Sequence, residues 1–173
     1  MCFVIFLVPA KSFFVSNRLF LLLPFFLFSE NISAQIKAKN GSVQDVLDRY
    51  YELGKALSGS ETKKALEKAK KLEAEIVSNN FISYFGSTFS ALQSASDIAQ
   101  LRLVYYQLSQ KLRKILPYSE TLDDVVYVLH CSACFHDSGA FWLSEDKSIH
   151  NPYLETENKS CEKFIETIKP MVK

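Results

Sequence analysis

The sequence contains little glycine or proline, almost no net charge, and no apolar run long enough to cross a membrane. Five Gly and five Pro among 173 residues argue against long low-complexity linkers. A formal net charge of +1 gives no electrostatic basis for binding nucleic acid or an anionic membrane. The remaining composition, 48% hydrophobic and 23% charged, is typical of a single globular domain.

The chain also lacks the short motifs of several enzyme classes. GxSxG, HExxH, the P-loop and GxGxxG are all absent from the sequence. A histidine near Cys131 or Cys134 could activate a thiol as a nucleophile. No pattern in the sequence supplies an oxyanion hole or a substrate pocket to go with it, so we predict that the protein is not an enzyme.

Residues 1–34 have the pattern of a secretory signal peptide. In RLFLLLPFFLF (18–28) a basic residue precedes ten apolar residues, about half of the ~20 that a membrane span requires. Small residues then lead to a cleavage site after Ala34. We predict a linker over residues 35–42, a periplasmic or secreted location, and no membrane span after cleavage. An uncleaved membrane anchor is the alternative, because a second apolar run, CFVIFLVPA, lies upstream.

Four segments of the remaining chain have apolar residues at helical spacing. Ser42, Ser60 and Asp97 precede three of them and are typical N-cap residues. Short connections between consecutive helices favour an antiparallel up-and-down bundle, and we predict an all-α fold. The predicted helical segments are residues 43–57, 60–80, 81–97 and 98–116.

The pattern changes after Pro117. Residues 125–130 are β-branched and aromatic, which predicts a short strand or extended segment, and a tight turn is expected at Gly139. The sequence KSCEKFIETIK near the C-terminus predicts a short final helix. We therefore expect one helical-bundle domain over residues 43–173, with a C-terminal cap, residues 125–161, that contains a short extended or hairpin segment.

The stretch LHCSACFHDSG places two cysteines and two histidines within seven positions, His130 to His136. The spacing of Cys131 and Cys134 lets two thiolates from one turn bind one metal ion. If the chain is extended after Cys134, His136 lies on the same face. Cys161 would complete a set of three sulfurs and one nitrogen, which suits Zn²⁺ and is compatible with Cu(I). His130 is a spare ligand.

A disulfide would use the same cysteines differently. Secreted proteins meet an oxidising environment, and three cysteines remain after the predicted cleavage. One bridge, Cys131–Cys161 or Cys134–Cys161, would leave one free thiol. A redox-active CxxC pair is a further alternative, although no βαβ pattern surrounds it. The last alternative is that the cysteines are plain buried thiols.

The stretch HCSACFHDSGAFWLSEDKSIHNPYLETENKSC resembles an uncharacterised family, the domain of unknown function three-three-four-seven. GAFWLS (139–144), IHNPY (149–153) and Cys161 follow the order and spacing of the family motif, and the preceding helices are similar in length. The resemblance extends over residues 43–169 and implies a helical bundle in the cell envelope. Family members occur alone behind a signal peptide or fused to periplasmic adaptor subunits of heavy-metal cation efflux pumps.

The resemblance implies a role with copper or a similar soft ion, and it maps Cys131 and Cys161 onto the two usual cysteines of the family. Two departures concern the thioethers. Ser and Ala stand at 132–133, where the family has Pro-Met, and Asn158 stands where it has Met. Both methionines, which are good ligands for Cu(I), are therefore missing.

Two hypotheses follow. In the first, Cys134 and His136 replace the methionines, and the protein is a soft-metal-binding accessory that holds Zn²⁺ or Cu(I) and acts beside an efflux adaptor. In the second, this chain retains only a Cys131–Cys161 bridge and is a structural or interaction domain that docks on an envelope protein. Redox state separates the two, because a metal needs thiolates and a bridge consumes them.

Overall fold

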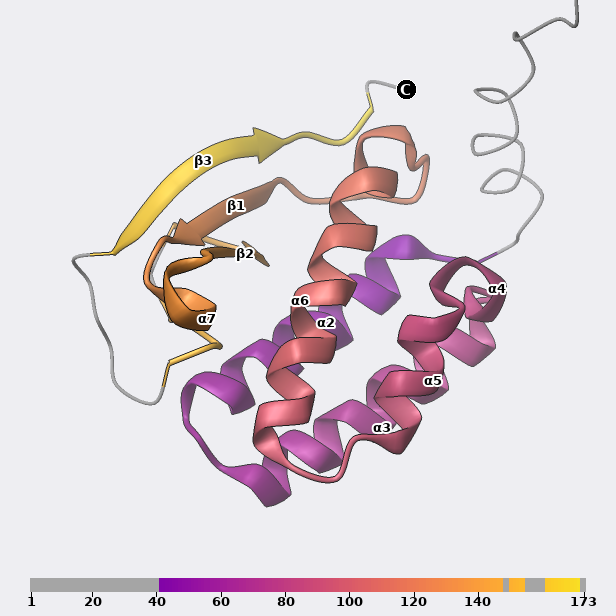
Figure 1. The fold of residues 1–173 in the computed structure, drawn as a ribbon. Coiled ribbons are helices and arrows are strands. Elements are labelled where there is room, and N and C mark those ends of the chain that lie inside the picture. Colours follow the sequence, from indigo (N-terminus) through magenta and orange to yellow (C-terminus); the bar gives the residue numbers. More distant parts are fainter. Residues whose placement is uncertain (1–40, 148–149, 155–160, 172–173) are drawn as a thin grey trace, which may run out of the picture.

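The computed structural model describes residues 41–147, 150–154 and 161–171, and Figure 1 shows their arrangement. The predicted signal peptide and most of the predicted linker lie outside these residues. Helices form one side of the described part, and a small sheet covers α6 on the other side (Figure 1). Within that part, no helix is both long and apolar enough to cross a membrane. The helices are α2 (Val43–Ser58), α3 (Thr62–Ser78), α4 (Ile82–Phe85), α5 (Ser87–Ser94), α6 (Ile98–Ile115) and α7 (Cys134–Asp137), with a 3-10 turn η1 (Leu116–Tyr118).

Two of the predicted helix starts are confirmed. The Ser42 side chain accepts a hydrogen bond of 3.1 Å from the Asp45 N–H at the start of α2. Asp97 accepts one of 2.8 Å from the Gln100 N–H at the start of α6. These bonds satisfy backbone donors that have no partner within the helix. The predicted cap at Ser60 is wrong, because α3 begins after Glu61 and has no side-chain cap.

The predicted Phe-rich helix is divided into α4 and α5 at Gly86. This residue has φ +50°, a left-handed conformation that glycine adopts without the steric cost of a Cβ atom. The break still leaves Phe85 and Phe89 buried against the rest of the helices. The apolar spacing therefore predicted the buried face correctly but not the interruption.

The predicted all-α fold is wrong, because the described residues contain a three-stranded antiparallel sheet and the fold is mixed α/β. β1 (Val126–Cys131) lies in the middle, between β2 (Ala140–Ser144) and β3 (Glu162–Ile168). The predicted strand over residues 125–130 is confirmed as β1, shifted by one residue. The predicted final helix is instead β3.

Pairing with β1 explains why the final segment is a strand. β3 contains Phe164, Ile165, Thr167 and Ile168, residue types that fit a pleated surface. It pairs along β1 from Val126 opposite Ile168 to Cys131 opposite Glu162, with an irregularity near Val128. An exposed seven-residue helix would be marginal on its own, whereas the strand gains a ladder of backbone hydrogen bonds.

Buried tyrosines join the helices to the sheet. The rings of Tyr50 on α2 and Tyr105 on α6 stack, with centroids 4.2 Å apart. The Tyr50 hydroxyl lies 2.7 Å from Ser109 Oγ and accepts a 3.0 Å bond from the Leu143 N–H of β2. One hydroxyl group therefore connects α2, α6 and the edge of the sheet.

A buried arginine holds the segment that precedes β3. Arg102 on α6 donates to the carbonyl oxygens of Pro152 at 3.1 Å and Leu154 at 3.3 Å. The same guanidinium also donates to Ser60 Oγ at 3.1 Å and to the Leu57 carbonyl at 3.4 Å. This fork of donors is a geometry that lysine cannot provide, and it joins the C-terminal part of the chain to the end of α2.

Candidate functional site

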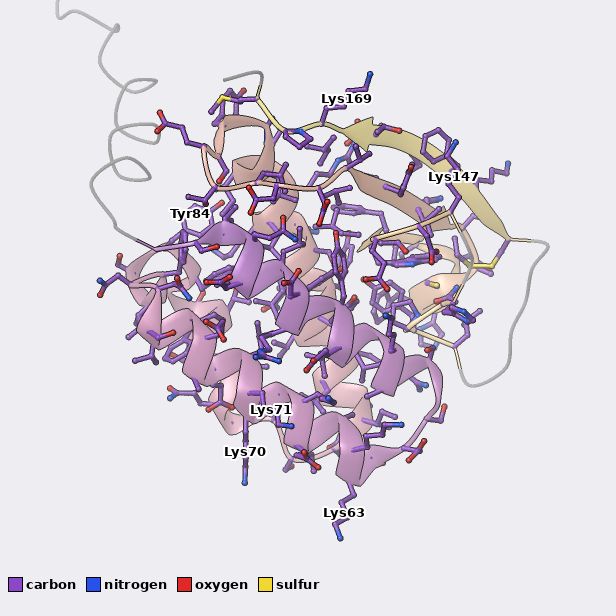
Figure 2. All side chains as sticks on the ribbon, turned by 180° about the vertical axis from the view of Figure 1, so that it is seen from behind. Lys63, Lys70, Lys71, Tyr84, Lys147 and Lys169 are labelled. Atoms are coloured by element: carbon purple, nitrogen blue, oxygen red, sulfur yellow. A yellow bond between two sulfur atoms is a disulfide. The ribbon has the colours of Figure 1, made fainter. Side chains whose placement is uncertain are left out.

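A disulfide joins Cys131, the last residue of β1, to Cys161, which directly precedes β3. The two Cα atoms are 4.8 Å apart, and the cysteines are separated by 30 positions in the sequence. Both residues are buried, and Figure 2 shows the sulfur–sulfur bond in yellow near the start of β3. Among the pairings that the sequence left open, the structure therefore contains the Cys131–Cys161 bridge.

The disulfide fixes the alignment of an edge strand. Cys131 pairs with Ala140 of β2 on one side and with Glu162 of β3 on the other. Because Cys161 is bonded to Cys131, β3 enters the sheet at one defined position. Farther along the strand, Arg113 on α6 makes an ion pair of 2.6 Å with Glu166, so β3 is also held to the helices.

The Cys134 thiol lies outside the disulfide and is completely buried. Its sulfur is 3.7 Å from Nδ2 and 3.9 Å from Oδ1 of Asn151, within the range of weak sulfur hydrogen bonds. Asn151 is buried too, and its Oδ1 accepts a 3.0 Å bond from the Tyr153 N–H. Cys134 therefore packs the turn after β1 against the NPY segment.

The two histidines of the stretch do not join these sulfurs. His136 is exposed and lies between Phe135 and Asp137, and all three residues have φ between +50° and +62°. The chain after Cys134 is thus a left-handed turn, so the extended conformation that would place Cys134 and His136 on one face is not present. His130 is half-buried.

The absence of a side chain at Gly139 leaves room for the imidazole of His130. A Cβ atom at Gly139 would lie 2.8 Å from His130 Nε2, and Gly139 has φ +76°. Both facts favour glycine at the predicted turn. His130 itself pairs with Phe141 across the β1–β2 ladder.

The oxidised molecule does not offer the predicted ligand set. Cys131 and Cys161 are consumed by the disulfide, Cys134 packs on Asn151, and His136 faces solvent. Over residues 41–147, 150–154 and 161–171, no three His, Cys, Asp or Glu side chains gather in a way that could hold a metal ion. The metal prediction therefore concerns the reduced protein and stays a prediction.

Aromatic rings cluster around Tyr153, which no pattern in the sequence predicted. Its ring centroid lies 5.3 Å from that of Phe135 and 6.0 Å from those of Tyr105 and Trp142. The Tyr153 hydroxyl donates to the Phe141 carbonyl at 2.8 Å, and burial raises its pKa well above the usual value. The GAFW and NPY motifs were the available signal, because they supply Trp142 and Tyr153.

No protein-family model, curated protein or solved structure matches this chain. The resemblance of the C-terminal motifs to an envelope family therefore stays a prediction from those motifs.

Proposed function

We propose that this chain is a non-catalytic interaction domain of the cell envelope, in which the Cys131–Cys161 disulfide holds β3 in place for docking on another envelope protein. The disulfide is the observation that carries the proposal. Bridges of this kind persist in oxidising compartments, which agrees with the predicted signal peptide. The motif resemblance suggests an efflux adaptor as the partner.

The surface of β3 supports a docking role. β3 is an edge strand, so its outer backbone groups can pair with an extended segment of another chain. Phe164 is 47% exposed and Ile165 is 44% exposed. The Lys147 ammonium lies 5.1 Å from the centroid of the Phe164 ring. This combination favours an extended partner segment with apolar side chains and a carboxylate.

Photo-crosslinking in the cell tests this proposal. A photoreactive phenylalanine analogue at Phe164 should give an adduct with an envelope protein. The same analogue at Lys63 is the control, because Lys63 lies on α3, far from Lys147 and the sheet in Figure 2. The adduct at position 164 should be lost when Cys131 and Cys161 are both replaced by Ser.

Two results would contradict docking through β3. One is the absence of any adduct at position 164 in cells that produce the folded protein. The other is an equal yield of the same adduct at position 63, since that would reflect proximity in the compartment rather than a specific surface.

A soft-metal role in the reduced protein is the second candidate. The disulfide brings together Cys131 and Cys161, two of the predicted ligands, so reduction would leave two thiolates side by side. Soft thiolates favour Cu(I). Titration of reduced protein with Cu(I) against a competing chelator should show binding that the double Ser variant loses. Unchanged uptake by that variant would exclude these cysteines as ligands.

A further inference from the structure

A cavity of about 290 Å³ lies where α2 and α6 meet the end of β2. Its volume is close to the lower end of the ~300–1,000 Å³ range of small-molecule sites. The cavity reaches the end of β2 opposite to Ala140, the residue that pairs with Cys131, so it is a separate site from the disulfide. The buried residues that line it are Tyr51, Gly54, Tyr105, Trp142 and Leu143.

The core fixes the walls of this cavity. The ring of Tyr105 stacks on Tyr50, and β2 is held by the bond from the Leu143 N–H to the Tyr50 hydroxyl. A Cβ atom at position 54 would lie only 2.2 Å from Tyr105 Oη, so Gly54 leaves room for the Tyr105 side chain at the wall. A cavity with fixed walls is formed before a ligand arrives, which lowers the entropic cost of binding.

Two buried hydrogen-bond donors line the cavity without an acceptor among the described residues. Tyr51 is 8% exposed and its hydroxyl has no such acceptor. Trp142 is 3% exposed and its indole N–H has none either. Burial raises the pKa of Tyr51 well above its usual value, so the hydroxyl keeps its proton. Because a buried donor without an acceptor is costly, these two groups favour a ligand that supplies one.

The charged side chains of the lining are exposed and include both signs. Lys55 and His150 are the basic residues, and Glu145 and Asp146 are the acidic ones. The Lys55 ammonium pairs with Glu145, and Asp146 and His150 have interactions of their own. The buried part of the lining contains aromatic and aliphatic groups and no charge. An ion that entered it would lose water without gaining a counter-charge, so the cavity favours a neutral ligand.

From these observations we infer that the cavity binds a small neutral molecule with a carbonyl oxygen on a compact apolar body, such as a cyclic ketone. The rings of Tyr51, Tyr105 and Trp142 contact the apolar body. The carbonyl oxygen accepts a hydrogen bond from the Tyr51 hydroxyl or the Trp142 N–H. A carbonyl group accepts hydrogen bonds and brings no donor of its own, which matches a wall where both unsatisfied groups can donate.

The indole N–H of Trp142 reports directly on this site. Trp142 is the only tryptophan of the chain, so its indole gives a single signal in a proton–nitrogen correlation spectrum. Isotope-labelled, oxidised protein from the cell envelope is titrated with cyclohexanone and, separately, with cyclohexylammonium and cyclohexanecarboxylate. We expect a saturable shift of this signal with cyclohexanone in the millimolar range, and binding of both ions that is weaker by about tenfold or more.

Two results of this titration would contradict the inference. Binding of either ion as tight as that of cyclohexanone would overturn the neutral ligand. The absence of saturation with cyclohexanone would overturn the site and leave water as the partner of the two donors.

Matched tyrosine variants locate the binding. Tyr51→Phe removes only the hydroxyl and should weaken cyclohexanone binding by about threefold or more. Tyr118→Phe is the control, because it makes the same change at an exposed tyrosine of η1 that does not line the cavity. The backbone signals of the same spectra show that each variant is folded. An unchanged affinity in Tyr51→Phe, or an equal loss in both variants, would overturn the assignment of the Tyr51 hydroxyl to this site.

Discussion

At the scale of single residues, the hydroxyl of Tyr50 joins three elements of the fold. It forms a hydrogen bond with Ser109 on α6 and accepts one from the Leu143 N–H in β2. Its neighbour Tyr51 is also buried, but its hydroxyl makes no hydrogen bond to a described residue. The two adjacent tyrosines thus offer a comparison of the same chemical change with and without partners.

Replacing Tyr50 by Phe should destabilise the fold by about 1–3 kcal/mol, because the buried Leu143 N–H would lose its acceptor. Tyr51→Phe, the matched control, should change the free energy of unfolding by much less. Urea unfolding followed by circular dichroism measures both values. Equal losses in the two variants would show that the Tyr50 bonds do not stabilise the structure.

The same hydroxyl predicts sensitivity to alkaline pH. Burial raises the pKa of Tyr50 from 10.0 to about 12. The unfolded chain therefore releases this proton first, and stability is lost as pH rises above about 10, by up to ~1.4 kcal/mol per pH unit for each such group. Urea midpoints measured from pH 8 to 11 should be flat at first and then fall. A midpoint that stays constant through pH 11 would contradict this assignment.

The buried position of Cys134 predicts a thiol that does not react in the folded protein. Its side chain is fully covered and lies against the Asn151 amide, and thiol reactivity requires access to an exposed thiolate. Iodoacetamide should label Cys134 only after denaturation, as read by peptide mass spectrometry. Rapid labelling under native conditions would show that the turn at residues 134–137 opens readily.

At the scale of elements, the sequence predicted a helix correctly where its capping residue, apolar spacing and helix propensity all agreed. α2 and α6 each have an N-cap side chain, an apolar face at 3.6 spacing and good helix formers, and both begin where predicted. In the segment that forms β3, the local signals did not favour one kind of element. Phe164, Ile165 and Ile168 fit a helix face and a strand about equally well, and pairing with β1, more than 30 positions earlier in the chain, decides between them.

For the candidate site too, the local sequence predicted the chemistry but not the long-range pairing. The cysteine spacing showed that a bridge or a metal was chemically reasonable, but only the antiparallel arrangement of β1 and β3 selects Cys161 as the partner of Cys131. A cavity of about 290 Å³ between α2, α6 and the end of β2 was beyond prediction, because the residues that line it are tens of positions apart in the sequence. No local pattern in the sequence indicates that Tyr51 and Gly54 line the same cavity.

Removing the disulfide should mainly affect β3. Cross-links of this length stabilise a fold by roughly 3–4 kcal/mol, chiefly through the entropy of the unfolded chain. Replacing Cys131 and Cys161 together by Ser should lower the free energy of unfolding by up to that amount and speed amide exchange in β3 more than in α2 or α6. Cys134→Ser is the control for sulfur loss without loss of the bridge. Unchanged exchange in β3 would show that strand pairing alone holds it.

At the scale of the whole molecule, the structure is a helical body with a C-terminal cap attached at several points. The disulfide fixes the start of β3, the Arg113–Glu166 ion pair fixes it farther along, and Arg102 holds the segment around Pro152. These attachments hold β3 and the segment before it against the helices.

We expect the Cys131–Cys161 bridge to be present in the working protein. The most direct test is the intact mass of protein recovered from the cell envelope without reductant, first native and then denatured. We predict a denatured mass two hydrogens below that of the fully reduced, cleaved chain, one alkylatable thiol, and no bound ion in the native spectrum. A native mass that includes one Zn or Cu, with all three thiols alkylatable after denaturation, would contradict the disulfide-bonded domain and support the metal site instead.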